Sequence, residues 1–377
     1  MTEPTVAIDA RLWGIKHTGP GRYTENLVRQ LLRLGPKLNF HLLVSREDAK
    51  EIAAQFEKIP STPIGARHYS VSEQLLLPLV LLKVRPKLLH VPHFNIPLFW
   101  PGKLVVTIHD LITHQFRGQD ETTLPLPIYW VKYVVHRLLM RVAVKRASAV
   151  IVPTQWVKSQ VVETYHLDKN KVFSTPEGVS PLFFAKPPTP QKEYLREKYH
   201  LPEVYLIYTG NAYKHKNLER LLQAIKEANI NLVFVCSRSV FRSRFEEKVK
   251  KANAQSLIYF LGQVPDSDLR ELYRFSLGFI TASLSEGFGL PALEAMAAGT
   301  VVLSSNAACL PEVYGKVPLY FNPLNVAEIV SSISLLKNLK PSERQDKITQ
   351  GQKHAALFTW QKTARLTLAA YEYALKH

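Results

Sequence analysis

The stretch TVAIDARLWGIKHTGPGRYTENLVRQLLRLG, residues 5–35, contains the pattern that decides the fold. It opens with TVAIDA (5–10), a short apolar run rich in β-branched side chains that predicts a strand. A helix is expected over residues 21–34, where four apolar side chains recur at helical spacing before a capping Gly35: Tyr23, Leu27, Leu31 and Leu34. A strand followed by an amphipathic helix is the repeating unit of a parallel sheet covered by helices.

The alternation of strand and helix continues along the chain. In the first half the strand-like runs are NFHLLV (39–44), KLLHV (87–91), KLVVTIHD (103–110) and SAVIV (148–152). In the second half they are VYLIYTG (204–210), NLVFVC (231–236), SLIYFLG (256–262), LGFITA (277–282) and TVVLSS (300–305). Between them we expect helices that begin at Asn217, Asp266 and Pro291. The sequence therefore predicts the α/β class with doubly wound parallel sheets.

A proline-rich segment, PEGVSPLFFAKPPTPQ (176–191), interrupts this alternation. Helices and long strands do not tolerate so many prolines, so the segment predicts a boundary between domains. We expect two facing Rossmann-like domains of similar size, residues 1–180 and residues 181–357, with a cleft between them. Residues 358–377 are expected to form a C-terminal helix that crosses back to the first domain.

Composition narrows the class of protein. The chain has 377 residues, 46% hydrophobic and 21% charged, which is a normal balance for a globular protein of two or three domains. Its two cysteines, Cys236 and Cys309, cannot form a disulfide framework, and the N-terminus resembles no secretory signal. The longest apolar run, LLLPLVLL (75–82), is too short to span a bilayer. We therefore expect a cytosolic protein that is neither secreted nor transmembrane.

The net charge is unusual. Lysine and arginine total 48 against 31 acidic residues, a formal charge of +17. Such a surface attracts polyanions, namely nucleic acid, anionic lipid headgroups or phosphorylated substrates. The chain contains no recognisable RNA-binding signature or zinc knuckle, so nucleic acid is not the expected partner.

The segment SEGFGLPALEAMAAG (285–299) is the strongest local motif. Gly287 and Gly289 follow a predicted strand, and Pro291 suits the first turn of a helix. Backbone N–H groups at such a helix start form an anion site. Glu286 before this loop, and Glu294 in what we expect to be the first helical turn, could accept hydrogen bonds from sugar hydroxyls. The alternative is an ordinary strand–loop–helix connection with two solvated glutamates.

Three further positions are candidates for ligand contacts. Lys216 follows a strand and the loop GNAYKH (210–215), where its ammonium could bind a diphosphate, although a surface lysine is the alternative. His109 ends an apolar strand and is expected at the ligand-binding edge of the sheet, although a buried structural histidine is the alternative. Gly19 and Gly21 are expected in a flexible loop that lets the backbone approach a ligand closely.

The frame E-G-F-G-L-P-x-L-E-A-M-A-x-G closely resembles the signature of retaining GT-B glycosyltransferases, the large family that includes bacterial mannosyl- and glucosyltransferases. Six other segments are similar to that family in the same order. They are HTGPGRYTENLVRQL (17–31), VVTIHDL (105–111), GNAYKHKNLERLLQA (210–224), FLGQVPDSDLRELY (260–273), and LPEV (310–313) with FTWQKTARLTLAAY (358–371). The resemblance covers essentially the whole chain and implies a GT-B fold.

The resemblance also implies roles for the nucleotide-sugar-binding residues of the second domain. Lys216 would bind the donor diphosphate, Glu294 the ribose hydroxyls and Glu286 the hydroxyls of the transferred sugar. Backbone N–H groups around the sugar and phosphate would come from Gly287, Phe288, Gly289 and Leu290. Val264 would contact the base through its backbone.

At one phosphate-binding position the sequence departs from the family pattern. The resemblance also implies roles for residues of the first domain, which would bind the acceptor. Asn211 stands where many relatives carry a phosphate-binding arginine, so that role would stay with Asn211 or shift to Lys214 or His215. His109 would lie by the transferred sugar, and Gly19 and Gly21 would approach the donor.

The implied reaction is metal-independent transfer of a hexose, with retention, from a nucleoside-diphosphate sugar to a hydroxyl acceptor, without a cofactor. We favour mannose from GDP-mannose, with glucose as the alternative, and a glycan or lipid-linked acceptor in surface polysaccharide or lipopolysaccharide synthesis. Four histidines could suggest a metal site, but their spacing fits none: His90, His93, His109 and His114. A nucleotide-sugar epimerase or hydrolase of the same fold, or a nucleic-acid-binding protein, is the alternative function.

Residues 129–148, YWVKYVVHRLLMRVAVKRAS, predict a long helix with five basic residues and no acidic one. Arg137, Arg141 and Lys145 share one face, and the apolar residues crowd the other. A basic amphipathic helix can lie on an anionic membrane, which would place the protein at the inner face of the cytoplasmic membrane. The alternative is a core-packed helix with a solvated basic face.

Overall fold

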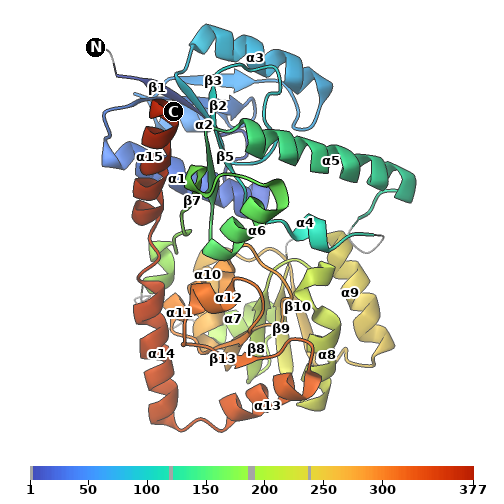
Figure 1. The fold of residues 1–377 in the computed structure, drawn as a ribbon. Helices are drawn as coiled ribbons and strands as arrows, with labels where there is room; N and C mark the ends of the chain where they lie inside the picture. Colours follow the sequence, from blue (N-terminus) through green and yellow to red (C-terminus); the bar gives the residue numbers. More distant parts are fainter. Residues whose placement is uncertain (1–2, 119–121, 186–191, 237–238) are drawn as a thin grey trace. The chain divides into compact units, whose positions relative to one another are not determined.

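The computed structural model describes residues 3–118, 122–185, 192–236 and 239–377 (Figure 1). The chain divides into two compact units. Unit 1 comprises Met1–Leu111, Pro125–Gly178 and Trp360–His377, and unit 2 comprises Ile112–Leu124 and Val179–Thr359. Residues 112–124 therefore group with unit 2, whereas the sequence-based boundary assigns them to the first domain. The C-terminal helix α15 (Trp360–Lys376) groups with unit 1.

Unit 1 contains a parallel sheet whose strands are ordered β3-β2-β1-β4-β5-β6-β7. The strands are β1 (Thr5–Asp9), β2 (Asn39–Ser45), β3 (Ser61–Ile64), β4 (Leu88–Val91), β5 (Lys103–Thr107), β6 (Ala149–Val152) and β7 (Val172–Ser174). The order reverses at β1, which pairs with both β2 and β4. Ligands bind outside the carboxyl ends of the strands at such a switch point. The doubly wound parallel sheet predicted from the alternation is confirmed.

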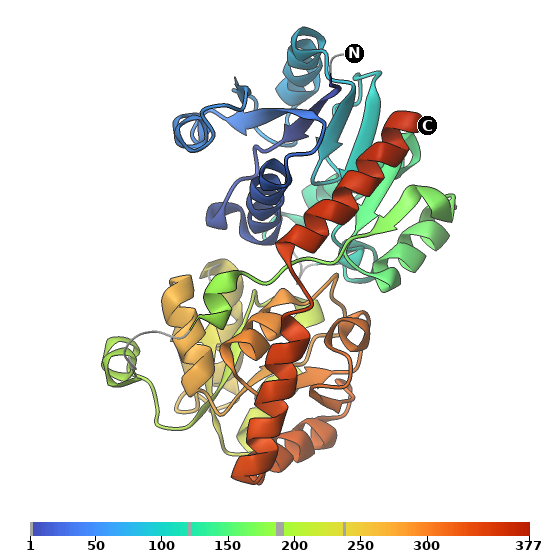
Figure 2. The same cartoon turned by 90° about the vertical axis from the view of Figure 1, so that its left-hand side faces the viewer.

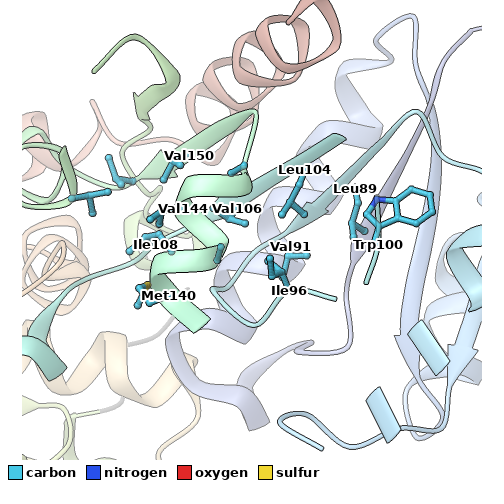
Figure 3. Close-up of a cluster of buried hydrophobic side chains, with 14 of the residues drawn as sticks. Leu89, Val91, Ile96, Trp100, Leu104, Val106, Ile108, Met140, Val144 and Val150 are labelled. Carbon is cyan, nitrogen blue, oxygen red and sulfur yellow. The ribbon is translucent and has the colours of Figure 1, made fainter. Parts of the chain in front are cut away.

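Helices cover both faces of this sheet. Its helices are α1 (Thr18–Leu34), α2 (Ala49–Gln55), α3 (Val71–Val84), α5 (Leu126–Arg146), α6 (Gln155–Tyr165) and α15, with short 3-10 turns at Ile15–His17 and Lys169–Lys171. On one face, α3, α5 and α6 bury Leu77, Val144 and Val161 in a core shown in part in Figure 3. On the other face, α1 and α15 bury Leu27 and Tyr371.

The alternation of side chains along each strand explains the two cores of unit 1. In β1, Val6 and Ile8 point to the core beneath α1, whereas Ala7 points to the core beneath α3. In β5, Val105 points to the core beneath α1, whereas Val106 points to the core beneath α3. Because both faces are covered, the central strands β4, β5 and β6 are apolar at most positions, which is the reason they were predictable.

Unit 2 contains a second parallel sheet, ordered β10-β9-β8-β11-β12-β13. The strands are β8 (Tyr205–Thr209), β9 (Asn231–Val235), β10 (Ile258–Leu261), β11 (Gly278–Thr281), β12 (Val302–Ser305) and β13 (Leu319–Phe321). The order again reverses at the first strand, since β8 pairs with both β9 and β11. The carboxyl ends of β8 and β11 therefore lie side by side, and the site of unit 2 forms there.

The helices of unit 2 surround this second sheet (Figure 2). They are α4 (Ile112–Gln115), α7 (Lys192–Tyr199), α8 (Leu218–Glu227), α9 (Ser239–Lys251), α10 (Asp266–Phe275), α11 (Leu290–Ala298), α12 (Leu310–Tyr314), α13 (Val326–Lys337) and α14 (Pro341–Ala355), with 3-10 turns at Pro181–Phe184 and Lys214–Lys216. The predicted start at Asp266 is confirmed, while the other two starts differ by one residue, at Leu218 and Leu290. Across the parts of the chain that are described, no helix combines the length and apolarity needed to cross a membrane.

Candidate functional site

Two neighbouring loops of unit 2 bring together a lysine and a glutamate. The Nζ of Lys216, in the loop after β8, donates a hydrogen bond to Oε1 of Glu286, in the loop after β11, at 2.6 Å. Ser283 donates to the same oxygen at 2.6 Å. The backbone ties the loops as well, because the N–H of Leu284 donates to the carbonyl of His215 at 2.7 Å. Two predicted site residues thus meet at the carboxyl edge of the sheet.

Electrostatics reinforces this pair. Burial alone would raise the pKa of Glu286, but the charge and hydrogen bond of Lys216 outweigh it and hold that pKa below its usual value. The carboxylate is therefore charged at neutral pH. Burial, aided by the charge of Lys216, lowers the pKa of His215 to about 4. A neutral His215 cannot supply the second cation considered from sequence, whereas Lys214 is exposed.

The glycine-rich loop continues from Glu286 into α11. Gly289 has φ +88° and caps the helix, and a Cβ there would lie 2.1 Å from the hydroxyl oxygen of Tyr314. That hydroxyl donates to the Gly289 carbonyl at 2.6 Å. Close packing and a left-handed backbone both require glycine at this position. Phe288 is buried behind the loop, and Leu290 begins the helix.

Glu294 lies in α11 and is buried. The expectation that it occupies the first helical turn is wrong, because the helix begins at Leu290 and Glu294 is its fifth residue. It therefore lies one turn deeper than the loop that carries Glu286.

Asn211 lies in the same loop as Lys216, whereas Val264 occupies another loop at the same edge. Asn211 follows Gly210, whose φ is +150°, and its carbonyl accepts a hydrogen bond from the Tyr208 hydroxyl at 2.9 Å. Val264 is buried in the connection between β10 and α10. Because β9 separates β10 from β8, Val264 belongs to a more distant part of the edge than the Lys216–Glu286 pair.

A cavity of about 560 Å³ lies within unit 2 beside the Lys216 loop. Its lining includes five basic side chains and two acidic ones: Lys214, Arg220, Arg244, Lys248, Lys251, Glu219 and Glu247. The excess of positive charge suits an anion. Neither Glu286 nor Glu294 lines this cavity, so it is separate from the carboxylates of the predicted site.

His109 lies at the carboxyl edge of unit 1, two residues beyond β5. Its Nε2–H donates to the carbonyl of Pro92 at 3.2 Å, and its Nδ1 lies 3.5 Å from Oε1 of Glu177. The Tyr23 ring packs edge-on at 4.8 Å. Burial lowers the pKa of His109, but Glu177, the Pro92 carbonyl and Asp110 together raise it above its usual value. Both ring nitrogens face an oxygen, an arrangement that favours the imidazolium.

Glu177 is a site residue that the sequence analysis missed. It stands three residues after β7, in the proline-rich segment that was interpreted only as a boundary. An acidic residue directly after a strand end was the available signal, since carboxyl ends of parallel strands meet at one edge.

The predicted flexible loop around Gly19 and Gly21 is not observed. Both glycines lie in the first turn of α1, which begins at Thr18, three residues earlier than expected. A Cβ on Gly21 would lie 2.3 Å from the carbonyl oxygen of Gly14, so Gly21 allows close packing of the preceding segment. Nothing lies within 4 Å of the corresponding position on Gly19.

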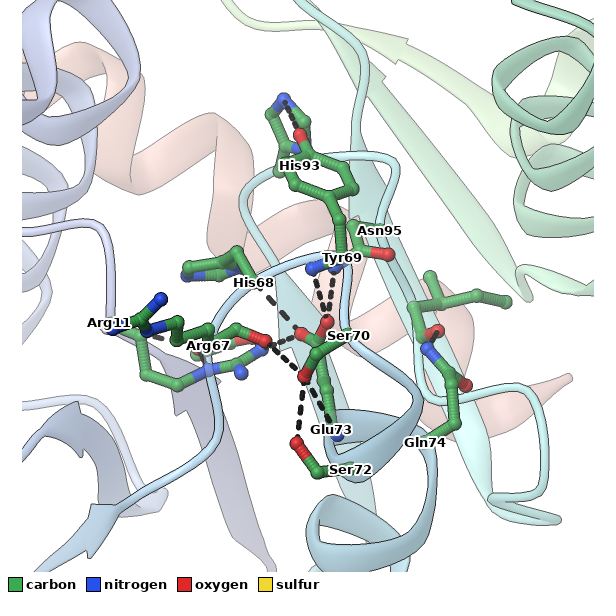
Figure 4. A network of polar contacts seen from close by, with 12 residues as sticks. Arg11, Arg67, His68, Tyr69, Ser70, Ser72, Glu73, Gln74, His93 and Asn95 are labelled. Atoms are coloured by element: carbon green, nitrogen blue, oxygen red, sulfur yellow. Dashed lines mark hydrogen bonds and ion pairs between the residues drawn. The ribbon is translucent and has the colours of Figure 1, made fainter. Parts of the chain in front are cut away.

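A buried ion-paired network also occupies this edge of unit 1 (Figure 4). Arg11 donates to both carboxylate oxygens of Asp9, at 2.8 and 2.5 Å, and to Glu73 at 2.6 Å. Glu73 also accepts from Asn95 at 2.8 Å and from the Tyr69 N–H at 2.7 Å. Burial would raise the pKa of Asp9, but Arg11 lowers it overall. The network fixes the start of α3 to the end of β1, and the sequence analysis did not identify it.

His90, one of the four histidines considered for a metal site, has a hydroxyl partner at each ring nitrogen. The two ring nitrogens of His90 lie 2.7 Å from the Tyr371 hydroxyl and 2.9 Å from the Thr107 hydroxyl. Burial lowers the pKa of His90 to about 3, so the ring is neutral. Within the described ranges, no three His, Cys, Asp or Glu side chains converge as ligands for a metal ion.

Two parallel α/β units with a glycine-rich loop at one carboxyl edge define a GT-B fold, and solved structures share it. A glycosyltransferase from Rickettsia africae aligns with a TM-score of 0.75 at 18% identity, over 100% of both chains. WaaG, a glycosyltransferase involved in lipopolysaccharide biosynthesis, aligns with a TM-score of 0.70 at 14% identity, over 97% of this chain and 98% of that one. Anabaena HepE, solved with UDP and glucose, has a TM-score of 0.75 at 14% identity, over 98% and 99% of the two chains. These likenesses establish the fold.

Family models identify the class more closely. The model "Glycosyltransferase Family 4" matches residues 17–181, and "Glycosyl transferases group 1" matches residues 191–354. The O-antigen chain mannosyltransferase RfbU of Salmonella typhimurium is 26% identical over 273 residues, 72% of this chain and 70% of that protein. O-antigen chain mannosyltransferase B of Escherichia coli is 28% identical over 294 residues, 75% and 73% of the two chains. The chain belongs to the group 1, family 4 glycosyltransferases and is a retaining glycosyltransferase.

Proposed function

We propose that the protein transfers a hexosyl group from a nucleoside-diphosphate sugar to a hydroxyl of a glycan or lipid-linked saccharide. The observation that carries the proposal is the Lys216–Glu286 pair, which joins a cation to a carboxylate beside a glycine-rich helix start. A diphosphate needs the cation, and a sugar needs hydrogen-bond acceptors. Mannose, with GDP-mannose as donor, is favoured because the two O-antigen relatives are named mannosyltransferases; glucose is the alternative.

In this proposal each site residue of unit 2 has a defined partner. Lys216 and the backbone of Gly287–Leu290 bind the diphosphate, and Glu286 accepts hydrogen bonds from the transferred sugar. Glu294, Asn211 and Val264 serve the ribose, a phosphate and the base, respectively. The short Lys216–Glu286 contact supports the first two roles because it holds both side chains at one point.

In unit 1 the proposal involves His109 and the start of α1. We propose that His109 contacts the transferred sugar, and its contacts with Glu177 and the Pro92 carbonyl support this by fixing the ring. Gly19 and Gly21 present the first turn of α1, rather than a loop, to the donor.

The proposed chemistry is a transfer on one face of the sugar. The bond from the anomeric carbon to the diphosphate oxygen breaks, and a new bond forms from that carbon to the acceptor oxygen. The departing oxygen takes the acceptor's proton. Lys216 and the loop N–H groups stabilise the charge that develops on the leaving diphosphate, which is the largest catalytic contribution such a site can make. We propose no covalent intermediate and no metal.

The cellular role we propose is synthesis of a surface polysaccharide, such as lipopolysaccharide, on the cytoplasmic side of the membrane. The support is the O-antigen naming of the relatives. A lipid-linked acceptor brings the enzyme to the membrane surface, and the basic helix at residues 129–148 agrees with peripheral contact there.

A panel of nucleotide sugars tests the donor. A ligand that binds only the folded state raises the melting temperature, and GDP-mannose is expected to raise it most. Lys216→Ala should abolish the shift, whereas Lys353→Ala, at an exposed position on α14, should retain it. Product analysis with and without a saccharide acceptor separates transfer from hydrolysis or epimerisation. Release of free sugar or an epimer at the same rate in both samples would refute transfer.

A further inference from the structure

Two helices of unit 1 expose many large apolar side chains. On α3 these are Val71, Leu75, Leu76, Leu79 and Leu82, and on α5 they are Leu126, Ile128, Trp130, Val131, Val134, Val135 and Leu138. We call this set the docking face. Both helices pack on the same core, so the docking face belongs to the helical layer on one side of the sheet (Figure 1). Apolar exposure on this scale marks an interaction surface.

Helix α3 is apolar on both of its sides. Leu77 and Leu81 point inward and are completely buried, whereas Leu75 and Leu79 point outward and remain 59% and 56% exposed. A surface helix ordinarily carries polar side chains on its outer face, and a helix that is apolar all round is covered on both sides. The sheet covers only one side of α3, so its outer side lacks a partner within unit 1.

Helix α5 meets the core only near its C-terminal end, where Met140, Ala143 and Val144 are buried. Its earlier turns leave Val131 and Leu138 66% and 62% exposed. The core-packed alternative considered from sequence therefore fits only the last part of the helix. Exposed Trp130 packs against Tyr129 and Tyr133, with ring centroids 5.3 and 5.5 Å away. Such amphipathic aromatic side chains are favoured where an apolar phase meets water.

The stretch of sequence that contains most of the docking face is strongly basic. Residues 74–162, which contain most of α3 and all of α5, include 11 lysines and arginines and only three acidic residues, Asp110, Asp120 and Glu121. The rest of residues 1–180 carry 12 basic and 11 acidic side chains, so nearly all of the positive excess of this half lies in 74–162. Lys83 and Arg85 at the end of α3, and Lys132 and Arg141 on α5, are exposed.

We propose that the docking face binds an anionic phospholipid bilayer, with its apolar side chains in the headgroup region and its lysines and arginines on lipid phosphates. Apolar burial and attraction to anionic lipid together are what hold a helix at a membrane surface. A second copy of the chain is a poorer partner, because pairing two such faces would bring like charges together. The inference rests on the proposed function in naming a lipid-linked acceptor, and it adds α3 as a second membrane element.

Vesicle sedimentation with the full chain tests the proposal without donor or acceptor. The protein should bind vesicles of mixed phosphatidylglycerol and phosphatidylcholine, and it should bind vesicles of phosphatidylcholine alone at least about tenfold more weakly. Rising salt concentration should release the protein from the anionic vesicles. Quenching of tryptophan fluorescence by brominated lipid should occur in the wild type and fall in Trp130→Phe.

Matched pairs of substitutions test whether the docking face is the surface that binds the vesicles. Leu75→Ser with Leu79→Ser should weaken binding to anionic vesicles by at least about tenfold, because two large apolar side chains no longer enter the lipid. Leu324→Ser with Leu335→Ser is the control, since these leucines of unit 2 are similarly exposed. All the altered residues are exposed, so the variants should keep the melting temperature of the wild type.

Three outcomes would overturn the inference. These are equal binding to neutral and anionic vesicles, equal weakening by the control pair, and a concentration-dependent dimer that Leu75→Ser with Leu79→Ser dissolves. Transfer to a water-soluble saccharide is measured separately on the same variants and should be unchanged. In the wild type, no binding to anionic vesicles with intact transfer refutes the docking face alone, whereas vesicle binding without transfer refutes the proposed function alone.

Discussion

The carboxyl edges of the two sheets hold different pairs of charged side chains. In unit 2, Lys216 and Glu286 meet at 2.6 Å, and the lysine keeps the pKa of the carboxyl below its usual value. In unit 1, His109 and Glu177 stand 3.5 Å apart, and the cation is an imidazole whose pKa is lowered by burial but raised overall by Glu177. The first pair suits a constant charge for a diphosphate, and the second makes one edge of the molecule sensitive to pH.

The largest expected effect comes from removing the cation of unit 2. Lys216→Ala should lower kcat for transfer by about 10²- to 10³-fold, because the leaving diphosphate loses a charged donor at the moment its charge develops. Initial rates with saturating nucleotide sugar provide the measurement. Lys353→Ala serves as the control, since this lysine on α14 is exposed and should change kcat by less than about threefold. Equal losses in the two variants would contradict the special position of Lys216.

A substitution at Gly289, in the backbone beside the Lys216–Glu286 pair, should have the next largest effect, and this effect is on stability. Gly289→Ala places a Cβ 2.1 Å from the Tyr314 hydroxyl oxygen at a φ of +88°, so the free energy of unfolding should fall by about 2–3 kcal/mol. Urea denaturation measures it. Gly262→Ala is the matched control, because nothing lies within 4 Å of the added carbon there. A change below about 0.5 kcal/mol in Gly289→Ala would show that the loop relaxes freely.

Breaking the His109–Glu177 pair of unit 1 should lower the stability by a smaller amount, and that amount depends on pH. The pKa of His109 is raised in the folded protein, so its pairing with Glu177 stabilises fully below the unfolded pKa of about 6.5. The stabilisation is lost as the pH rises through the folded pKa. Glu177→Gln should therefore destabilise by about 1 kcal/mol near pH 6 and by less near pH 9, in urea denaturation at both values.

Activity provides the second measurement on Glu177. If Glu177 positions and charges His109, Glu177→Gln should shift the pH profile of kcat toward acid, and Glu177→Asp should restore part of it. Glu163→Gln, at an exposed position on α6 of the same unit, is the control. An unchanged profile in Glu177→Gln would separate His109 from the chemistry.

The smallest expected effect is that of a chelator. Because the proposed stabilisation of the diphosphate comes from Lys216 and backbone N–H groups, EDTA should change kcat by less than about twofold. Mg²⁺ added back after dialysis is the control. Loss of activity with EDTA and recovery with Mg²⁺ would mean that a metal takes part.

Much of the fold follows from the sequence, because strands buried on both faces are continuous apolar runs. The strands that escaped prediction are short or polar. β3 is four residues with Pro63 inside, and β7 and β13 have three residues each. The early start of α1 escaped because glycines and Pro20 were interpreted as a loop, although proline is favoured in a first helical turn.

The site was less predictable, because contacts between loops depend on strand order. Lys216 and Glu286 are 70 residues apart and meet because β8 and β11 are neighbours, which no local pattern reveals. Glu177 reaches His109 although β6 lies between their strands. Motif similarity identified Lys216 and Glu286 as candidates, whereas the Arg11 network lies outside any motif and only the three-dimensional structure shows it.

The last helix, α15, has a consequence for the order in which the two units complete their folding during synthesis. α15 supplies Trp360 and Tyr371 to the core of unit 1, and Tyr371 contacts His90 at 2.7 Å. Every segment of unit 2 leaves the ribosome before α15 does. The half of the protein that translation starts first is therefore the half that finishes folding last. A premature stop codon after residue 359 would spare unit 2 while leaving one face of the unit 1 sheet without the helix that packs beside α1.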